Sequence, residues 1–362
     1  MRKTEKRGGL YSCVRRLLVC AVSLILAALL LPAPKAQAEE FPKVNAASAI
    51  VMNSGGEIVF EKDADRRSLI ASTTKLLTAL VVLERAVPAE ESEIRPEWTG
   101  VEGSSMYLRA GERYTVRELL EGLLLASGND AATALACHTA GGVEAFADLM
   151  NRRAKELGMN GSHFANPHGL DDPAHYSTAR DLALLMAACL QNRSLAALLA
   201  EKSAVVGDQT YVNHNKLLTL CPGCLGGKTG FTEAAGRCLV SCCEREGTRL
   251  ICVTLCDPDD WVDHQLLYNW AFSRYATRNV TEKLSFQVPV VSGERRFAAV
   301  EARALRLFLP RTAEITLTAH LPRFVFAPVR EGEHAGTVQV FRDGERIHEA
   351  ELIFSEGAAP AA

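Results

Sequence analysis

Residues 72–86 read STTKLLTALVVLERA, and this stretch decides how the rest of the chain is arranged. Its apolar residues fall on nearly all sides of a helix, which is typical of a helix buried at the centre of a domain. We therefore expect a central helix over residues 73–86. Because Ser72 and Lys75 are three residues apart, one helical turn places their side chains on the same face.

Strand and helix patterns follow on both sides of this helix. Residues 47–61 predict a hairpin that turns at Asn53-Ser54-Gly55-Gly56. Thr115 and Glu118 form a capping-box pattern, and Asp130 is a candidate cap for the helix after it. Further helices are expected at residues 115–124, 131–139, 146–157, 178–190 and 261–275, and a second hairpin at residues 237–243 and 249–255. Strands at both ends with helices between them predict an α/β (α+β) domain, in which helices cover one antiparallel sheet.

The pattern changes to short alternating strands from about Val280. They are expected at residues 286–291, 297–302, 314–319, 338–342 and 345–354, and Asp343-Gly344 is a strong hairpin turn between the last two. We assign residues 39–278 to the α/β domain and residues 279–356 to a small C-terminal β-sandwich-like domain. Residues 357–362 are expected to form a disordered tail.

The first 38 residues have the pattern of a signal peptide. A basic leader precedes an apolar run at residues 17–31, and Ala36-Gln37-Ala38 supplies small residues for cleavage. An uncleaved membrane anchor is the alternative, although the run is short for a membrane span. These residues hold seven basic groups and one acidic group, so the remainder carries 33 basic and 42 acidic residues, a net charge of −9. That charge argues against nucleic acid as a partner.

Nine of the 11 cysteines lie beyond the leader, and an odd number cannot all pair within one chain. Several stand in apolar runs, where cysteine behaves as a small hydrophobic residue. Cys221-x-x-Cys224, with Cys242, Cys243 or Cys252, is a weak candidate zinc site. We expect neither a metal nor a cofactor. His168, His175 and His214 lack metal-ligand spacing and are expected to pack or form hydrogen bonds.

Three short motifs carry the chemistry. The first motif is Ser72-Thr73-Thr74-Lys75. Ser72 is a weak nucleophile that needs a base. An apolar helix removes a lysine from water and lowers its pKa, which suits Lys75 for this role. In the second, Ser127-Gly128-Asn129, the hydroxyl suits proton relay and the amide suits binding of a peptide carbonyl. In the third, Lys228-Thr229-Gly230, the lysine and threonine suit a carboxylate, and the glycine lets substrate backbone approach. Each motif is weak alone, but their order and placement are specific.

With these motifs the chain resembles the D-alanyl-D-alanine carboxypeptidases, the low-molecular-mass penicillin-binding proteins. The resemblance covers residues 46 to the C-terminus and includes the segments ASTTKL (71–76), NPHGL (166–170), HYSTARD (175–181), NHNKLL (213–218) and GKTGFT (227–232).

The resemblance implies a transpeptidase- or β-lactamase-like fold and attack of Ser72 on the penultimate D-Ala carbonyl of cell-wall stem peptides ending in D-Ala-D-Ala. It implies an oxyanion hole from the backbone N–H groups of Ser72 and Phe231, acylation by β-lactams, and a role for Arg249 at the substrate carboxylate. It also implies an extracytoplasmic location. Many relatives end in an amphipathic membrane-binding helix. The residues after Phe354 do not have the apolar stripe of such a helix, so the sequence does not predict whether the protein is attached to a membrane.

Two alternatives remain at this point. A class A-like β-lactamase shares the motifs but needs a glutamate that activates the deacylating water, and the candidate here is Glu156. We interpret Glu156 as a solvated helix position, with Gly158 ending that helix. A catalytically silent penicillin-binding sensor is the second alternative, and the intact motifs argue against it. The sequence does not separate carboxypeptidase from endopeptidase preference, vegetative from sporulation roles, or one oligomeric state from another.

Overall fold

The structure is a computed structural model that describes residues 41–361. The predicted signal peptide lies outside the described residues. Within them, no single helix is long and apolar enough to cross a membrane. The helices Ala179–Gln191 and Arg193–Ala200 together reach that length and composition, but they meet at a bend of 106°.

The first part of the chain forms a five-stranded antiparallel sheet in the order β2-β1-β9-β8-β7, with β7 at one edge. The strands are β1 (Ser48–Asn53), β2 (Ile58–Lys62), β7 (Cys224–Thr232), β8 (Gly236–Arg245) and β9 (Thr248–Leu255). Both predicted hairpins are confirmed. An edge strand leaves backbone N–H and C=O groups on its outer side for other partners, and β7 carries Lys228-Thr229-Gly230.

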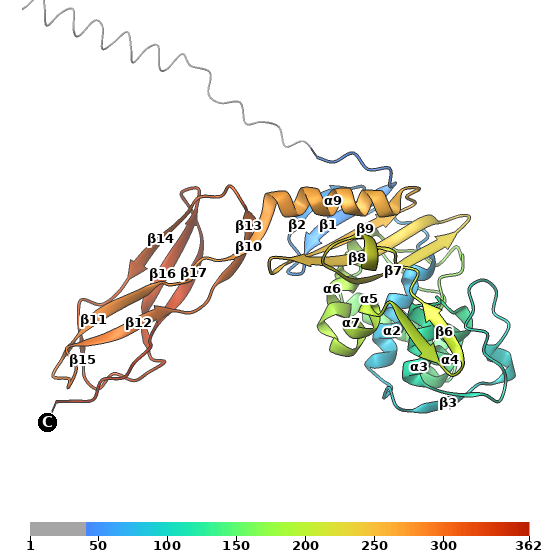
Figure 1. Ribbon diagram of the computed structural model, residues 1–362, viewed down its shortest axis with the longest axis horizontal. Helices are drawn as coiled ribbons and strands as arrows, with labels where there is room; N and C mark the ends of the chain where they lie inside the picture. The colour runs from blue at the N-terminus through green and yellow to red at the C-terminus, as the bar shows by residue number, and fades with distance from the viewer. Residues whose placement is uncertain (1–40, 362) are drawn as a thin grey trace, which may run out of the picture. The chain divides into compact units, whose positions relative to one another are not determined.

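Each face of this sheet packs against a different group of helices, because side chains alternate between the faces of a strand. On β9, Ile251 and Val253 belong to the larger core, whereas Leu250 and Cys252 belong to the smaller one. Figure 1 shows α9 (Asp260–Arg274) along one face and the other helices on the opposite side. Those helices are α2 (Lys75–Leu83), α3 (Val116–Leu124), α4 (Asn129–Ala140), α5 (Val143–Glu156), α6 (Ala179–Gln191) and α7 (Arg193–Ala200).

The central helix begins as a 3-10 turn, η1 (Ala71–Thr74), and continues as α2. Every residue from Lys75 to Val82 is buried, which confirms the prediction of a helix that is enclosed on all sides. The regular helix ends at Leu83, three residues earlier than predicted. Burial of each leucine in it contributes about 2 kcal/mol to stability, so the surrounding core fixes the position of the residues that begin the helix.

The break between α3 and α4 differs in detail from the sequence prediction. The Thr115–Glu118 capping box is present at the start of α3. Asp130, however, does not cap α4, which begins at Asn129 after Gly128. Its carboxylate instead accepts the backbone N–H groups of Met106 and Leu108 at 2.9 and 3.1 Å. Asp130 therefore ties the loop before α3 to the start of α4.

Short elements connect the larger ones. They are β3 (Glu91–Glu93) paired with β4 (Arg113–Thr115), η2 (Pro96–Trp98), β5 (Ser203–Val206) paired with β6 (Gln209–Val212), and α8 (Leu217–Leu220). The sequence analysis did not predict α7 or these short strands, since each lacks a long periodic pattern.

The C-terminal part forms a six-stranded sheet in the order β14-β16-β17-β12-β11-β15. Its strands are β11 (Ser285–Val291), β12 (Phe297–Ala302), β14 (Ile315–His320), β15 (Val325–Phe326), β16 (His334–Arg342) and β17 (Glu345–Phe354). The β16–β17 hairpin turns at Asp343-Gly344 as predicted, with φ angles of 52° and 86°. The additional strand β13 (Arg306–Pro310) pairs with β10 (Tyr275–Asn279), so the predicted boundary at residue 278 falls inside β10.

The structure corrects the prediction of a disordered tail for residues 357–361. Ala358 pairs with Val329 and Pro360 with Gly293. Ala358 is 3% exposed and belongs to the core of the C-terminal sheet. A small apolar residue at this point fills the core, and its burial offsets the entropy lost by ordering the chain end.

Candidate active site

Ser72 and Lys75 lie at the start of the central helix. Ser72 is in η1 and Lys75 is the first residue of α2, with its side chain fully buried. The Nζ atom of Lys75 is 2.7 Å from Oγ of Ser72. The residue before the serine, Ala71, has φ of 46°, in the left-handed region that non-glycine residues rarely adopt. Strain of this kind is concentrated at functional sites.

The Lys75 amine has two further partners, both oxygen acceptors. It donates to Oδ1 of Asn129 at 2.6 Å and to the backbone carbonyl of His168 at 2.8 Å. A neutral amine has two N–H groups and one lone pair, so two carbonyl acceptors and one hydroxyl donor satisfy it completely. Burial, and then the nearby charge of Lys228, lowers the pKa of Lys75 well below its usual value, while Asp130 opposes this shift. The surroundings therefore favour the uncharged amine.

A second serine–lysine pair lies opposite. Ser127, in the break between α3 and α4, has φ of 61° and is buried. Lys228 on β7 is 1% exposed and donates to Oγ of Ser127 and to the carbonyl of Thr229, each at 3.0 Å. Burial lowers the pKa of Lys228 to about 7.

Gly230 brings the edge strand against the nucleophile. A Cβ atom at this position would lie 2.9 Å from the carbonyl oxygen of Ile70 and 3.0 Å from the backbone nitrogen of Ser72. Only glycine leaves this narrow space free. Thr229 and Phe231 stand on either side of Gly230 on β7, and the Phe231 side chain is 65% exposed.

The structure thus brings together the predicted residues of all three motifs, from the central helix, the α3–α4 break and β7. These are Ser72, Lys75, Ser127, Asn129, Lys228, Thr229, Gly230 and Phe231. Asn129 is held in place by its Nδ2 group, which donates to the carbonyl of Glu102 at 2.5 Å.

Arg249 does not join this cluster, which corrects the sequence prediction. It pairs with Glu244 across the β8–β9 hairpin, with N–O distances of 2.9 and 2.8 Å. Lys228 is level with Val240 on β8 and with Val253 on β9. Arg249 is therefore two strands from β7 and about 13 Å further along the sheet. The strand register thus places Arg249 near the hairpin turn, where it forms an ion pair with Glu244.

His175 supports the backbone before the nucleophile, a contact that the sequence analysis did not assign. The N–H of Ala165 donates to Nδ1 of His175 at 3.2 Å, so the ring proton is assigned to Nε2 and faces Oγ1 of Thr74 at 2.8 Å. Oγ1 of Thr74 in turn donates to the carbonyl of Ala71 at 2.8 Å. Burial lowers the pKa of His175 to about 4, so the ring is neutral near pH 7.

His168 is also neutral, since burial and then the Lys75 charge lower its pKa to about 3. Its Nδ1 accepts the N–H of Leu170 at 3.2 Å. The prediction that His168 and His175 serve in hydrogen bonding is confirmed. Their position in the segments quoted above was the only sequence signal for these roles.

Gly169 allows the His168 carbonyl to reach Lys75. Its φ is 86°, and a Cβ atom would lie 1.9 Å from the carbonyl oxygen of Ala71 and 2.8 Å from Oγ1 of Thr74. No other residue can occupy this position without moving the backbone that carries Ser72.

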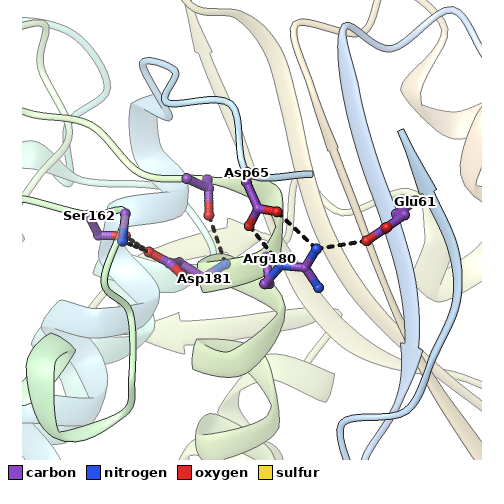
Figure 2. Close-up of polar contacts among 7 residues, drawn as sticks. Glu61, Asp65, Ser162, Arg180 and Asp181 are labelled. Carbon is purple, nitrogen blue, oxygen red and sulfur yellow. Dashed lines mark hydrogen bonds and ion pairs between the residues drawn. The ribbon is translucent and has the colours of Figure 1, made fainter. Parts of the chain in front are cut away.

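A polar cluster further from the site anchors the loops around it, as Figure 2 shows. Arg180, in α6, bonds to both carboxylate oxygens of Asp65 at 2.7 and 3.0 Å and to Glu61 at 2.7 Å. Asp181 accepts the N–H of Gly161 at 2.8 Å and the hydroxyl of Ser162 at 2.6 Å. These contacts join α6 to β2, to the segment that leads toward Ser72 and to the loop before His168.

An open groove of about 860 Å³ begins beside the second serine. Its lining includes Ala126, Ser104, Tyr107, Tyr211 and His214. Burial and then the charge of Lys228 lower the pKa of His214, which fits a position near that lysine.

Glu156 lies at the end of α5 with its side chain 63% exposed and paired with Arg153 at 3.0 Å. This confirms its interpretation as a solvated helix position, with Gly158 beyond it in the left-handed region. Among residues 41–361, no group of three or more histidine, cysteine or acidic side chains has the arrangement of a metal site.

Comparison with known proteins agrees with this geometry. Residues 35–259 match the D-alanyl-D-alanine carboxypeptidase family. The chain belongs to this family. It is 33% identical to the D-alanyl-D-alanine carboxypeptidase DacC of Escherichia coli (strain K12), over 88% of this chain and 86% of that protein. It is 28% identical to the carboxypeptidase DacF of Bacillus subtilis (strain 168), over 85% of this chain and 84% of that one.

Solved structures give the same result. Penicillin binding protein 6B from Escherichia coli is similar with a TM-score of 0.71 and 26% identity, over 87% of this chain and 97% of that one. Penicillin binding protein 5 from Haemophilus influenzae has a TM-score of 0.69 and 28% identity, over 88% and 99%. The chain is thus a serine-type D-alanyl-D-alanine carboxypeptidase of the low-molecular-mass penicillin-binding class, with the mixed α/β fold and C-terminal β-rich region expected from sequence.

Proposed function

We propose that Ser72 is the nucleophile and Lys75 its general base. Oγ of Ser72 attacks the carbonyl carbon of the penultimate D-Ala while its proton passes to Nζ of Lys75. The observation that carries this proposal is the set of three partners around Nζ, because the two carbonyl acceptors hold the N–H groups and leave the lone pair for the serine hydroxyl.

Attack converts the carbonyl oxygen to an oxyanion, and the backbone N–H groups of Ser72 and Phe231 are the proposed donors to it. Ser72 stands at the start of the central helix, where the helix dipole favours negative charge. The close approach of β7 at Gly230 supports this role, because it brings the backbone of the two segments to the same point.

Breakage of the C–N bond then releases the terminal D-Ala as an amine that needs a proton. That proton is the one that Lys75 took from Ser72. Ser127 is the proposed relay, since its hydroxyl accepts a hydrogen bond from Lys228 and lies two residues before Asn129, which contacts Lys75. The transfer leaves Lys75 neutral again. Water completes the cycle by attacking the carbonyl carbon of the Ser72 ester while Lys75 takes its proton. The bond to Oγ of Ser72 then breaks, the proton passes from Lys75 to that oxygen, and the shortened peptide leaves.

Lys228 and Thr229 are the proposed ligands of the carboxylate of the terminal D-Ala. A buried ammonium binds a carboxylate strongly because water does not screen the pair. Asn129 is the proposed donor to a substrate peptide carbonyl. The groove beside Ala126 is open and polar, and it is the proposed path of the rest of the stem peptide.

The proposed substrates are peptidoglycan stem peptides ending in D-Ala-D-Ala, with β-lactams as covalent inhibitors that acylate Ser72. Action on such peptides implies an extracytoplasmic location, and residues 1–38 are the proposed signal for export.

Mass spectrometry of a pentapeptide wall fragment after incubation with the purified protein tests the proposal. We expect loss of one alanine and, with penicillin present, an adduct on the peptide that contains Ser72. Cleavage of a cross-linked dimer with the pentapeptide left intact would contradict the carboxypeptidase assignment. Rapid turnover of penicillin would favour a β-lactamase, and an adduct without alanine release would favour a silent sensor.

A further inference from the structure

Three thiols meet at the end of β7 that is remote from Gly230. Cys221 follows α8, Cys224 begins β7, and Cys243 lies on β8 directly opposite Cys224 in the strand register. The sulfur atoms of Cys221 and Cys243 are 3.4 Å apart. The proposed carboxypeptidase mechanism uses none of these residues.

The surroundings distinguish the members of this thiol cluster (Cys221, Cys224 and Cys243). The guanidinium of Arg245 lies 3.6 Å from the Cys221 sulfur. The Cys243 thiol, which donates to that sulfur, and the Arg245 charge lower the pKa of Cys221, whereas the pKa of Cys243 is raised. The pKa of Cys224 is lowered as well, chiefly by the same Cys243 thiol. The cluster therefore combines two thiols that ionise more readily with one that keeps its proton, and the short distance between the sulfur atoms of Cys221 and Cys243 selects that pair for oxidation in two steps.

We propose that Cys221 and Cys243 form a redox-active pair that a hydroperoxide converts to a disulfide. The Cys221 thiolate attacks one peroxide oxygen, the O–O bond breaks, and hydroxide leaves to take up a proton as water. Cys221 is then a sulfenic acid. The Cys243 sulfur attacks it, the S–O bond breaks, and a second water leaves with the Cys243 proton. Two thiols and one hydrogen peroxide give one disulfide and two waters.

Geometry and access both support this step. A disulfide bond is about 2.0 Å long, so the two sulfurs need to approach by little more than 1 Å. Cys221 is only 4% exposed, but Pro222 and Gly223 beside it are exposed and Cys224 is half-buried. A molecule as small as hydrogen peroxide can reach such a site, whereas a bulky disulfide reagent meets more obstruction.

The bond would close a ring from residue 221 to residue 243 around the β7–β8 hairpin, which carries Lys228-Thr229-Gly230. Cross-linking a loop of this length lowers the entropy of the unfolded chain, which raises the melting temperature by several degrees. Oxidation would therefore stabilise the strand that lines the active site.

The test uses the purified full chain, reduced and then treated with hydrogen peroxide, followed by alkylation and non-reducing peptide mass spectrometry. We expect a cross-linked peptide joining Cys221 to Cys243, about 2 Da lighter than the sum of its reduced parts. The melting temperature should rise by about 5 °C, and a reductant should reverse both changes.

Variants make the assignment specific. Cys221→Ser should lose the cross-link and the rise in melting temperature, while Cys137→Ser, a half-buried cysteine elsewhere, should keep both. Cys224→Ser should also keep the Cys221–Cys243 link. A dominant Cys224–Cys243 link, complete alkylation of all three thiols after peroxide, or zinc bound at one equivalent in the untreated protein would each overturn the proposal. None of these measurements depends on peptidase activity, so their outcome is independent of the proposed function.

Discussion

The proposed active site contains two serine–lysine pairs that share a buried lysine but differ in their surroundings. Lys75 faces Ser72 from the same helical turn and donates to the Asn129 amide and the His168 carbonyl. Lys228 faces Ser127 from an edge strand, and its other acceptor is the carbonyl of its own neighbour, Thr229. Both side chains are removed from water.

The difference supports the opposite tasks that we propose for these two residues of the same type. Burial lowers the pKa of both lysines, but for Lys75 the charge of Lys228 adds to the effect and the shift is large. A lysine whose pKa is lowered well below its usual value suits the role of base, since it has a neutral amine that can accept a proton. The other lysine, with a pKa of about 7, can still carry charge near neutral pH and hold an anion.

The largest expected effect follows from Ser72→Ala. Removal of the hydroxyl should abolish covalent labelling by fluorescent penicillin, since Ser72 supplies the hydroxyl among the three groups that contact Nζ of Lys75. Circular dichroism should show an unchanged fold. Ser127→Ala is the matched control from the second pair: it should slow the reaction and still give an adduct on Ser72. Persistent labelling of Ser72→Ala would place the nucleophile elsewhere.

Lys75→Ala should slow acylation by penicillin by about 10³-fold, because general-base activation of the serine is lost. Lys75→Arg tests whether a cation can replace a proton acceptor at this position, since arginine remains protonated. Both variants should be slow in stopped-flow labelling. A nearly normal rate in either would remove Lys75 from the role of base.

The sequence contained the information for the first pair, because one helical turn separates Ser72 from Lys75, but not for the contact of Lys228 with Ser127, which is 101 residues away. It did not reveal that the His168 carbonyl completes the partners of Lys75. A backbone carbonyl contributed from 93 residues away has no signature in residue type. Arg249 was misplaced for a related reason, since the register of β9 determines its position and short periodic patterns do not fix register.

The proposed anion-binding role of Lys228 predicts a dependence on pH with a definite sign. The folded-state pKa of about 7 means that Lys228 loses its charge as the pH rises through 7. The KM for a peptide with a free terminal carboxylate should therefore increase by about 10-fold or more between pH 6 and pH 9, given the strength of a charged hydrogen bond. Binding of the C-terminally amidated peptide, measured as competitive inhibition, should lack this rise. Equal pH dependence of the two peptides would contradict the role.

The smallest effect concerns the glycine that supports the first pair. Gly169→Ala should lower the melting temperature by about 5 °C or more, because the added Cβ meets the Ala71 carbonyl and the left-handed φ is strained. Gly207→Ala is the matched control, since Gly207 has a φ of 61° with no atom near its Cβ position. It should lower the melting temperature by only about 3 °C. Equal shifts in differential scanning calorimetry would mean that the contact with Ala71 contributes nothing.

The most direct test of the account is a measurement of the charge on the Lys75 amine. Nuclear magnetic resonance of protein labelled with ¹³C at lysine Cε reports protonation, and Lys75→Arg and Lys228→Arg assign the two buried signals. The account predicts that Lys75 titrates well below the usual lysine range, because burial and the charge of Lys228 lower its pKa. A Lys75 signal that stays protonated up to about pH 10 would contradict the assignment of this amine as the base.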